Sequence, residues 1–165
     1  MNNEQDFEDV YQRAKPKLQK YVARRVFGDS SEIVDEIFLT AWRRKADIPD
    51  DHEAQMMWLY AIGRRTIANS LRWNARLDLF NRTNTALVET STSNNSSETT
   101  ILVHDCLSRL RKKDREILLL IEWDDFSILE AATILEISEA AVTKRLKQAR
   151  DSFIVLYSSR SSEAN

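Results

Sequence analysis

The sequence is short of the residues that build sheets, disulfides and membrane spans. Its 165 residues include two glycines, two prolines and one cysteine. So few glycines and prolines leave little turn chemistry for β-sheets, and one cysteine cannot form an internal disulfide. No apolar run approaches the roughly 20 residues that cross a bilayer, and the N-terminus lacks the basic and apolar regions of a secretory signal. We therefore expect an all-α, cytoplasmic protein with one or two small helical cores.

The same shortage argues against enzymatic and metal sites. The two glycines, Gly28 and Gly63, are too far apart to form a phosphate-binding loop. His52 and His104 also lie far apart, with no cysteines or paired carboxylates at metal-ligand spacing around them. Cys106 has apolar neighbours, which predict a buried thiol and no nucleophilic role. We expect no catalytic residue, no metal and no cofactor, so the chain should act by binding.

Charge is balanced overall and uneven locally. The chain carries 24 Lys and Arg residues and 26 Asp and Glu residues. A stand-alone DNA-binding protein usually has a clear cationic excess, so this balance favours weak DNA binding unless a partner assists. Residues 63–77 contain arginines and no acid, whereas residues 29–36 concentrate acidic side chains. One surface is therefore suited to phosphate and another to a basic partner.

Two helical blocks flank a polar segment. Residues 81–100 are rich in Ser, Thr and Asn and have no sustained apolar period, which predicts a flexible linker. We expect residues 1–80 to form one helical domain and residues 101–160 a second. In the first domain, apolar spacing predicts a helix that ends at Gly28, with a kink or restart at Pro16. It also predicts helices over residues 32–46 and 53–79.

The third predicted helix combines aromatic and cationic side chains. A capping box of Asp50 and Glu53 would begin it. Aromatic rings beside arginines suit single-stranded DNA, whose bases stack and whose backbone needs cations. The alternative is that the rings pack inside the protein. We favour this alternative for Trp42, Trp58 and Leu59, because aromatic stripes at helical spacing are normally buried.

Residues 114–150 have the pattern of a helix-turn-helix. Ser127 and Glu130 form a capping box that begins its first helix. Residues 136–138 make the turn, with Ser138 as N-cap of a second helix. In this turn, Glu136 is unstrained only if its φ is negative.

The second helix of this motif has a buried face and a cationic face. Helical spacing predicts that Val142, Leu146, Ala149 and Phe153 are buried. It leaves Ala140, Thr143, Lys144 and Lys147 outward, with Arg145 and Gln148 on the flanks. Such a face suits a DNA major groove, although a capped helical hairpin with a solvated basic face has the same spacing.

Three segments resemble one protein family. Residues 32–42, E-I-V-D-E-I-F-L-T-A-W, resemble the D-L-V-Q-E-T-F-L-R-A-W segment of extracytoplasmic-function sigma factors, the small promoter-specificity subunits of bacterial RNA polymerase. The stretch W-L-Y-A-I-G-R-R that begins at Trp58 is similar to the family's W-L-x-x-I-A-x-N-x-x-x-D-x-x-R helix, and residues 114–150 are similar to its C-terminal domain. Both blocks occur in the family's order around a linker. The chain departs from the family pattern at Asp35, Arg65, Asn69 and Glu136.

The resemblance implies sites for core RNA polymerase and promoter DNA. The acidic second helix would contact the clamp helices of the largest polymerase subunits through Asp35, Glu36, Phe38 and Trp42. The minus-ten element would be captured as single strand by Pro49, Asp50, Asp51 and His52 in a loop and by Arg64, Arg65, Asn69, Arg72 and Arg76 on the third helix. The minus-thirty-five element would be read as duplex by Thr143, Lys144, Arg145, Lys147 and Gln148. An anti-sigma factor is a further partner common in the family.

Two other interpretations remain open at this point. A stand-alone helix-turn-helix regulator would bind duplex DNA by itself, usually as a dimer on a palindromic site. A structural or interaction protein would keep both helical cores and would need no basic face in residues 63–77. The balanced charge argues against the first of these. If the second were correct, arginine substitutions in residues 63–77 should leave partner binding unchanged.

Overall fold

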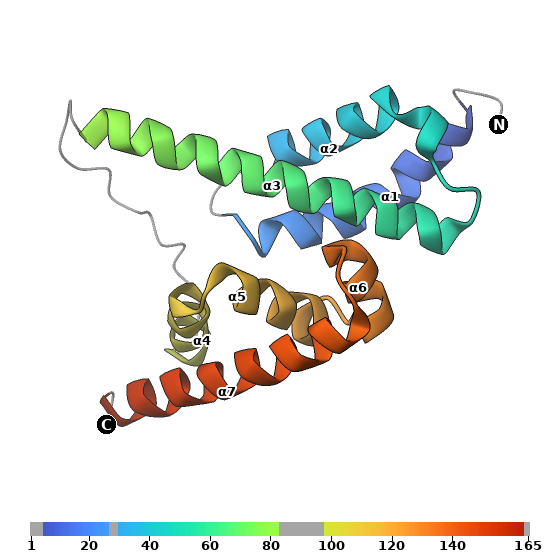
Figure 1. The fold of residues 1–165 in the computed structure, drawn as a ribbon. Helices are drawn as coiled ribbons and strands as arrows, with labels where there is room; N and C mark the ends of the chain where they lie inside the picture. Colours follow the sequence, from blue (N-terminus) through green and yellow to red (C-terminus); the bar gives the residue numbers. More distant parts are fainter. Residues whose placement is uncertain (1–4, 27–29, 83–97, 164–165) are drawn as a thin grey trace. The chain divides into compact units, whose positions relative to one another are not determined.

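The computed structural model describes residues 5–26, 30–82 and 98–163, and these residues form helices and turns without a strand. The helices are α1 (Gln5–Ala23), α2 (Ser31–Arg43), α3 (His52–Arg82), α4 (Glu98–Arg109), α5 (Lys112–Leu118), α6 (Ile128–Leu135) and α7 (Glu139–Glu163) (Figure 1). A 3₁₀ turn, Lys45–Asp47, follows α2, and a π-helical segment, Leu119–Trp123, follows α5. The predicted all-α class is confirmed over the described ranges.

The chain divides into two compact units, Met1–Ala86 and Leu87–Asn165. The first contains α1 to α3 and the second contains α4 to α7. Most of the predicted linker, residues 83–97, lies outside the described residues. The limits proposed above for the linker and the two domains stay a prediction.

The first two helices differ in detail from the sequence-based expectation. Pro16 lies inside a single helix α1, so the helix does not restart there. Proline at this position costs one backbone hydrogen bond because it has no N–H. Helix α1 ends at Ala23, and Gly28 lies outside the described residues. Helix α2 is shorter than the predicted 32–46, because the chain tightens after Arg43 into the 3₁₀ turn.

The N-terminus of α3 is capped one residue later than predicted. The side-chain oxygen Oδ2 of Asp51 accepts a hydrogen bond from the backbone N–H of Ala54 at 2.9 Å, and the helix begins at His52. The capping box assigned to Asp50 and Glu53 is therefore wrong. An Asp-Asp pair offers two cap positions with the same chemistry, and the sequence does not distinguish between them.

In the first unit, the three helices pack around one apolar core. Its buried side chains include Ala14, Leu18, Tyr21 and Val22 from α1, Val34, Ile37, Phe38 and Ala41 from α2, and Met56, Leu59, Ile62 and Ile67 from α3. Gly63 permits the close approach of these helices. A Cβ at this position would lie 3.2 Å from Cδ1 of Ile37 and 3.5 Å from Cε1 of Tyr21. The Ile37 side chain would have to shift by a few tenths of an ångström to admit a Cβ, whereas the distance to Tyr21 is an ordinary van der Waals contact.

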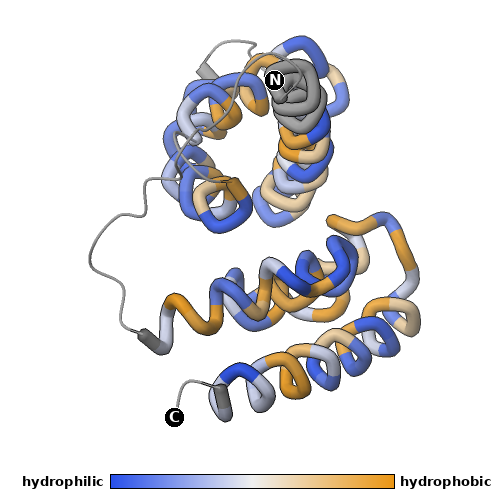
Figure 2. The backbone as a smooth tube through the Cα atoms, turned by 90° about the vertical axis from the view of Figure 1, so that its left-hand side faces the viewer, coloured by the Kyte–Doolittle hydropathy of each residue, from blue (hydrophilic) through white to orange (hydrophobic). Residues whose placement is uncertain are grey.

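In the second unit, α7 packs against α4, α5 and α6. The buried residues are Cys106, Leu107 and Leu110 from α4 and the turn after it, Ile117 to Leu120, Ala131, Ala132, Ile134 and Leu135 from α6, and Val142, Leu146 and Ala149 from α7. Hydrophobic and hydrophilic residues alternate along these helices, as expected for amphipathic helices (Figure 2). Phe153, predicted to be buried, is half-buried and stacks on Tyr157 with ring centroids 6.0 Å apart.

Candidate functional site

The helix-turn-helix in the second unit has the caps that its sequence predicts. The Ser127 hydroxyl oxygen accepts a hydrogen bond from the Glu130 N–H at 3.2 Å, and Glu130 Oε2 accepts one from the Ser127 N–H at 2.8 Å. This capping box begins α6. Ser138 Oγ accepts a hydrogen bond from the Ala141 N–H at 3.2 Å and caps α7. Both helices of the motif therefore begin at the predicted residues.

The turn between these helices contains a residue in a left-handed conformation. Glu136 has φ 56° and ψ 43°, and its N–H donates to the Thr133 carbonyl at 3.3 Å. The neighbouring Ile137 N–H donates to the Ala132 carbonyl at 3.1 Å. These bonds satisfy carbonyls at the end of α6, as a glycine cap would. A residue with a Cβ is strained at a positive φ, so the backbone of Glu136 is strained. The negative φ that would have avoided this strain does not occur.

The first turns of α7 present a cationic face. Thr143, Lys144, Lys147 and Gln148 are exposed, and Arg145 is half-buried. Beneath them, Val142 and Ala149 have no exposed surface. The Thr143 hydroxyl donates to the Glu139 carbonyl at 3.0 Å, which leaves its oxygen as an acceptor toward the outside. The structure thus brings all five predicted minus-thirty-five residues together on two turns of one helix.

Helix α3 carries a second cationic face. Arg65, Asn69 and Arg72 are exposed at spacings of four and three residues, which places them on one side of the helix. Arg72 donates to the side-chain oxygen of Asn69 and to the Ala68 carbonyl. Arg64 is half-buried beside this face. Arg76 belongs to α3, but its side chain lies outside the described ones.

Three of the other predicted minus-ten residues lie in the loop before α3, whereas His52, predicted for the loop, is the first residue of the helix. Asp50, Asp51 and His52 are exposed and Pro49 is half-buried. Asp51 serves as the cap of α3, so one of its oxygens is already in use. The Pro49 carbonyl accepts a hydrogen bond of 2.9 Å from the amide nitrogen of Gln55. No local pattern of residues indicates this last contact.

The exposed face of α2 is acidic with one apolar residue. Asp35 and Glu36 are exposed, and Leu39, one turn later, is 43% exposed. Leu39 was not among the residues predicted for this face, although helical spacing places it outside the buried stripe of α2. Phe38 differs from the expectation, because it is only 5% exposed and packs on Tyr11 with ring centroids 4.5 Å apart. It supports this face from below and offers no contact surface of its own.

The two tryptophans and one leucine that were predicted to be buried are divided between core and surface. Leu59 is buried as predicted, whereas Trp42 and Trp58 are half-buried. The Trp42 ring meets Phe7 edge-on at 5.0 Å, and the Lys45 ammonium lies 4.1 Å from its centroid. Such cation–π contacts hold a partly exposed ring in place. Trp42 thus borders the acidic face of α2 as a fixed apolar surface.

Other classes of site find no support in the described part of the chain. No group of three metal-ligating side chains occurs in residues 5–26, 30–82 and 98–163. In the same ranges, no helix is long and apolar enough to span a membrane. Cys106 is fully buried, as predicted, and burial raises the pKa of its thiol. A thiol with a raised pKa forms little of the reactive thiolate.

Comparisons with known proteins converge on one family. Residues 100–152 match the family model described as sigma-70, region 4. The ECF RNA polymerase sigma factor SigL of Mycobacterium tuberculosis is 26% identical over 146 residues, which cover 85% of this chain and 82% of SigL. RNA polymerase sigma factor SigZ of Bacillus subtilis is 24% identical over 147 residues, which cover 88% and 83%.

Two solved structures share the fold. The sigma factor RpoE from Bartonella quintana, in complex with the anti-sigma factor NepR, aligns over 92% of this chain and 96% of its own with a TM-score of 0.70 and 19% identity. CnrH, in complex with the cytosolic domain of CnrY, aligns over 96% and 91% with a TM-score of 0.67 and 22% identity. At these identities the structures establish the arrangement of helices and do not assign individual residues.

Proposed function

We propose, from the premise that this chain is an extracytoplasmic-function sigma factor, that its three exposed faces divide the work of promoter recognition. The chain binds core RNA polymerase and directs promoter recognition and transcription initiation. The main observation that supports this proposal is the cationic face of α7. It is held by two N-caps, its five candidate residues lie on two turns, and it falls within the residues that match sigma-70 region 4. A stand-alone regulator is not favoured, because the similarity to SigL extends over 85% of the chain.

Each face has chemistry suited to one partner. The acidic face of α2, Asp35, Glu36 and Leu39 bordered by Trp42, would contact a basic surface of the polymerase. The loop before α3 and the exposed Arg65 and Arg72 would hold the minus-ten element as single strand, with the arginines neutralising phosphates. The outward side chains of α7 would read the minus-thirty-five element in the major groove. Every step in this mechanism is a binding step.

The polymerase would combine two weak DNA contacts into one strong one. The net charge of −2 predicts that neither unit binds DNA tightly by itself. When both units are held on one polymerase, binding of the first DNA element makes binding of the second intramolecular. Promoter affinity would then exceed that of either contact alone. An anti-sigma factor that covered the polymerase-binding or DNA-binding faces would prevent this.

The first experiment is gel filtration of the purified chain with sigma-free bacterial core polymerase, followed by a promoter-opening assay. We expect co-elution and opening. Arg72→Glu should abolish opening and preserve co-elution, because it reverses charge on the single-strand face and leaves α2 intact. Lys17→Glu, which also reverses a positive charge, at an exposed position of α1, is the matched control. Normal opening by Arg72→Glu would overturn the single-strand assignment, and duplex binding without co-elution would favour a stand-alone regulator.

Lys144→Ala tests the duplex-binding face. We expect it to weaken binding of the minus-thirty-five element by about 1–3 kcal/mol if the ammonium contacts a base edge, and by less if it contacts phosphate alone. Titrating the polymerase complex with duplex DNA at several salt concentrations separates these cases. Lys112→Ala, at an exposed position of α5, is the control. Unchanged affinity in Lys144→Ala would remove this residue from the face.

A further inference from the structure

Gln55 is a polar side chain in an apolar position. It is 5% exposed, and among the residues that the structure describes it is the one buried polar or charged side chain. Both ends of its amide have partners. Its oxygen accepts from Nη2 of Arg13 at 2.5 Å, and its nitrogen donates to the Pro49 carbonyl at 2.9 Å. A buried amide needs a donor for its oxygen and an acceptor for its nitrogen, and Gln55 has both.

Arg13 fixes the orientation of that amide. A guanidinium can only donate, so the atom of Gln55 that faces Arg13 must be the oxygen, and the nitrogen must face Pro49. The second terminal nitrogen of Arg13, Nη1, lies 3.5 Å from Nε2 of His52. Its Nε is buried and has no hydrogen-bond partner. Arg13 on α1 therefore joins two residues of α3 and, through Gln55, the loop before α3.

The bond to Pro49 controls the middle of this loop. The ends of the loop are held separately, by the Arg44 and Asp47 ion pair at 3.1 Å and by the Asp51 cap. The Pro49 carbonyl belongs to the same rigid peptide plane as the Asp50 N–H, and no cis peptide occurs among the described residues, which include this one. In a trans peptide the two groups point in opposite directions. The Gln55 bond consequently directs the Asp50 N–H away from the buried amide.

We propose that Gln55 and Arg13 are positioning residues that set the base preference of the loop before α3. By fixing the plane of the peptide between Pro49 and Asp50, they present a backbone donor and the exposed Asp50 side chain in one orientation. An unpaired base would be selected by how well its edge matches that arrangement. This inference rests on the proposed function, in which the loop captures the minus-ten element.

Gln55→Glu separates this role from simple core packing. A glutamate keeps the contact with Arg13 as an ion pair, but its carboxylate cannot donate to the Pro49 carbonyl and repels it. The variant should keep the hydrogen-exchange protection of α1 and α3, co-elution with core polymerase and binding to the minus-thirty-five duplex. On polymerase-bound forked DNA, with each minus-ten base varied in turn, discrimination between preferred and other bases should fall by at least about fivefold.

The control is Gln12→Glu, the same chemical change at the exposed neighbour of Arg13, which should leave the base profile unchanged. A wild-type base profile in Gln55→Glu would overturn the inference. Failure of the unmodified chain to bind polymerase or open promoters would overturn the proposed function instead, so the two failures are distinguishable.

A second pair of variants decides the matter if Gln55→Glu loses hydrogen-exchange protection. Arg13→Lys keeps a cationic donor for the Gln55 oxygen and therefore keeps the amide oriented, whereas Arg13→Met does not. We expect reduced base discrimination in Arg13→Met and recovery in Arg13→Lys. Equal base profiles in these two variants would contradict a positioning role.

Discussion

The turn between α6 and α7, which precedes the candidate DNA-contacting face of α7, and the loop before α3, itself a candidate DNA contact, are held in different ways. The turn is held by neighbours in sequence. The Glu130 carboxylate accepts from the Ser127 N–H, and the Ser138 hydroxyl oxygen accepts from the Ala141 N–H, each three residues away. The Glu136 N–H donates to a carbonyl at the end of α6. The loop depends on Gln55, which is held in turn by Arg13 from another helix, 42 residues earlier.

Losing a contact should affect more of the structure at the loop than at the turn. Each local cap joins residues within one turn of helix, so the loop that it closes is very short. Losing a cap should therefore weaken only the helix end that it caps. The contact between Arg13 and Gln55 exists only when α1 has docked on α3, and it is buried. Its loss should therefore affect both the packing of the first unit and the shape of the loop.

Arg13→Met should lower the unfolding free energy of the first unit by about 1–3 kcal/mol, because it leaves the buried Gln55 oxygen without a donor. Hydrogen exchange of α1 and α3 amides in the whole chain measures this without assuming that both units unfold together. Gln12→Met, at the exposed neighbouring position, is the control. Equal protection in both variants would show that the distant contact contributes no more than a surface residue.

Asp51→Ala should cost about 1 kcal/mol at the start of α3, because it removes the acceptor for the Ala54 N–H. Asp50→Ala, which removes the same charge one residue earlier, should stay within about 0.5 kcal/mol of the unmodified chain. Exchange rates of the first-turn amides of α3 distinguish the two variants. The reverse order of effects would restore the capping box that the sequence suggested at Asp50.

The same contrast decides what could be read from the sequence. The helix-turn-helix was predicted nearly residue by residue, because Ser127, Glu130 and Ser138 act on backbone groups three positions away and leave a pattern in the chain. Helical spacing also placed the cationic residues of α7 on an outward face. The all-α class followed from composition and from amphipathic periodicity.

What the sequence could not supply depends on tertiary contacts. Nothing near Gln55 marks it as buried or identifies Arg13 as its partner, and that contact forms only in the folded first unit. The π-helical segment Leu119–Trp123 leaves no recognisable pattern, since it replaces one hydrogen-bond register by another.

Glu136→Gly should stabilise the second unit by about 0.5–1 kcal/mol. Glycine adopts the observed φ of 56° without the strain of a Cβ, and this gain exceeds the entropy that glycine adds to the unfolded chain. Glu136→Ala removes the same carboxylate but keeps a Cβ, so it should give no such gain. The measurement is amide exchange of α6 and α7. Equal stabilisation by both substitutions would attribute the effect to charge and not to backbone conformation.

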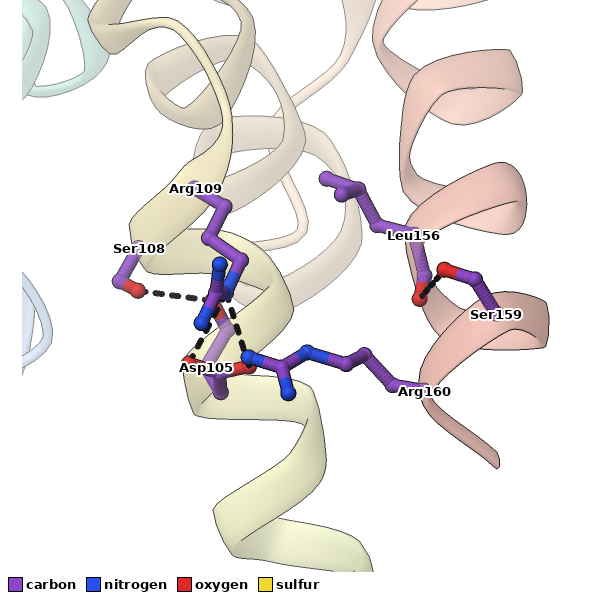
Figure 3. Close-up of polar contacts among 6 residues, drawn as sticks. All are labelled: Asp105, Ser108, Arg109, Leu156, Ser159 and Arg160. Carbon is purple, nitrogen blue, oxygen red and sulfur yellow. Dashed lines mark hydrogen bonds and ion pairs between the residues drawn. The ribbon is translucent and has the colours of Figure 1, made fainter. Parts of the chain in front are cut away.

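Asp105→Asn should have the smallest effect, because the distant polar contact of the second unit is exposed. Asp105 on α4 accepts from Arg109 Nε at 3.0 Å and pairs with Arg160 Nη2 on α7 at 2.9 Å (Figure 3). The hydrogen bond from Arg109 lowers the pKa of this carboxyl more than burial raises it, and the charges of Arg109 and Arg160 lower it further. Exposed pairs of this kind contribute little to stability and are screened by salt.

The pH dependence of this effect follows from the lowered pKa. A carboxyl whose pKa is lower in the folded than in the unfolded state stabilises the fold above its ordinary pKa, and this contribution is lost as pH falls through the lowered value. Thermal unfolding should therefore show a small deficit of Asp105→Asn at neutral pH that shrinks as pH falls below the ordinary aspartate range. The exposed Asp151→Asn on α7 is the control. A loss of stability as large as that of Arg13→Met, or one that persists in acid, would contradict this prediction. The exposed contact of Asp105 with Arg160 would then matter as much as the buried contact of Arg13 with Gln55.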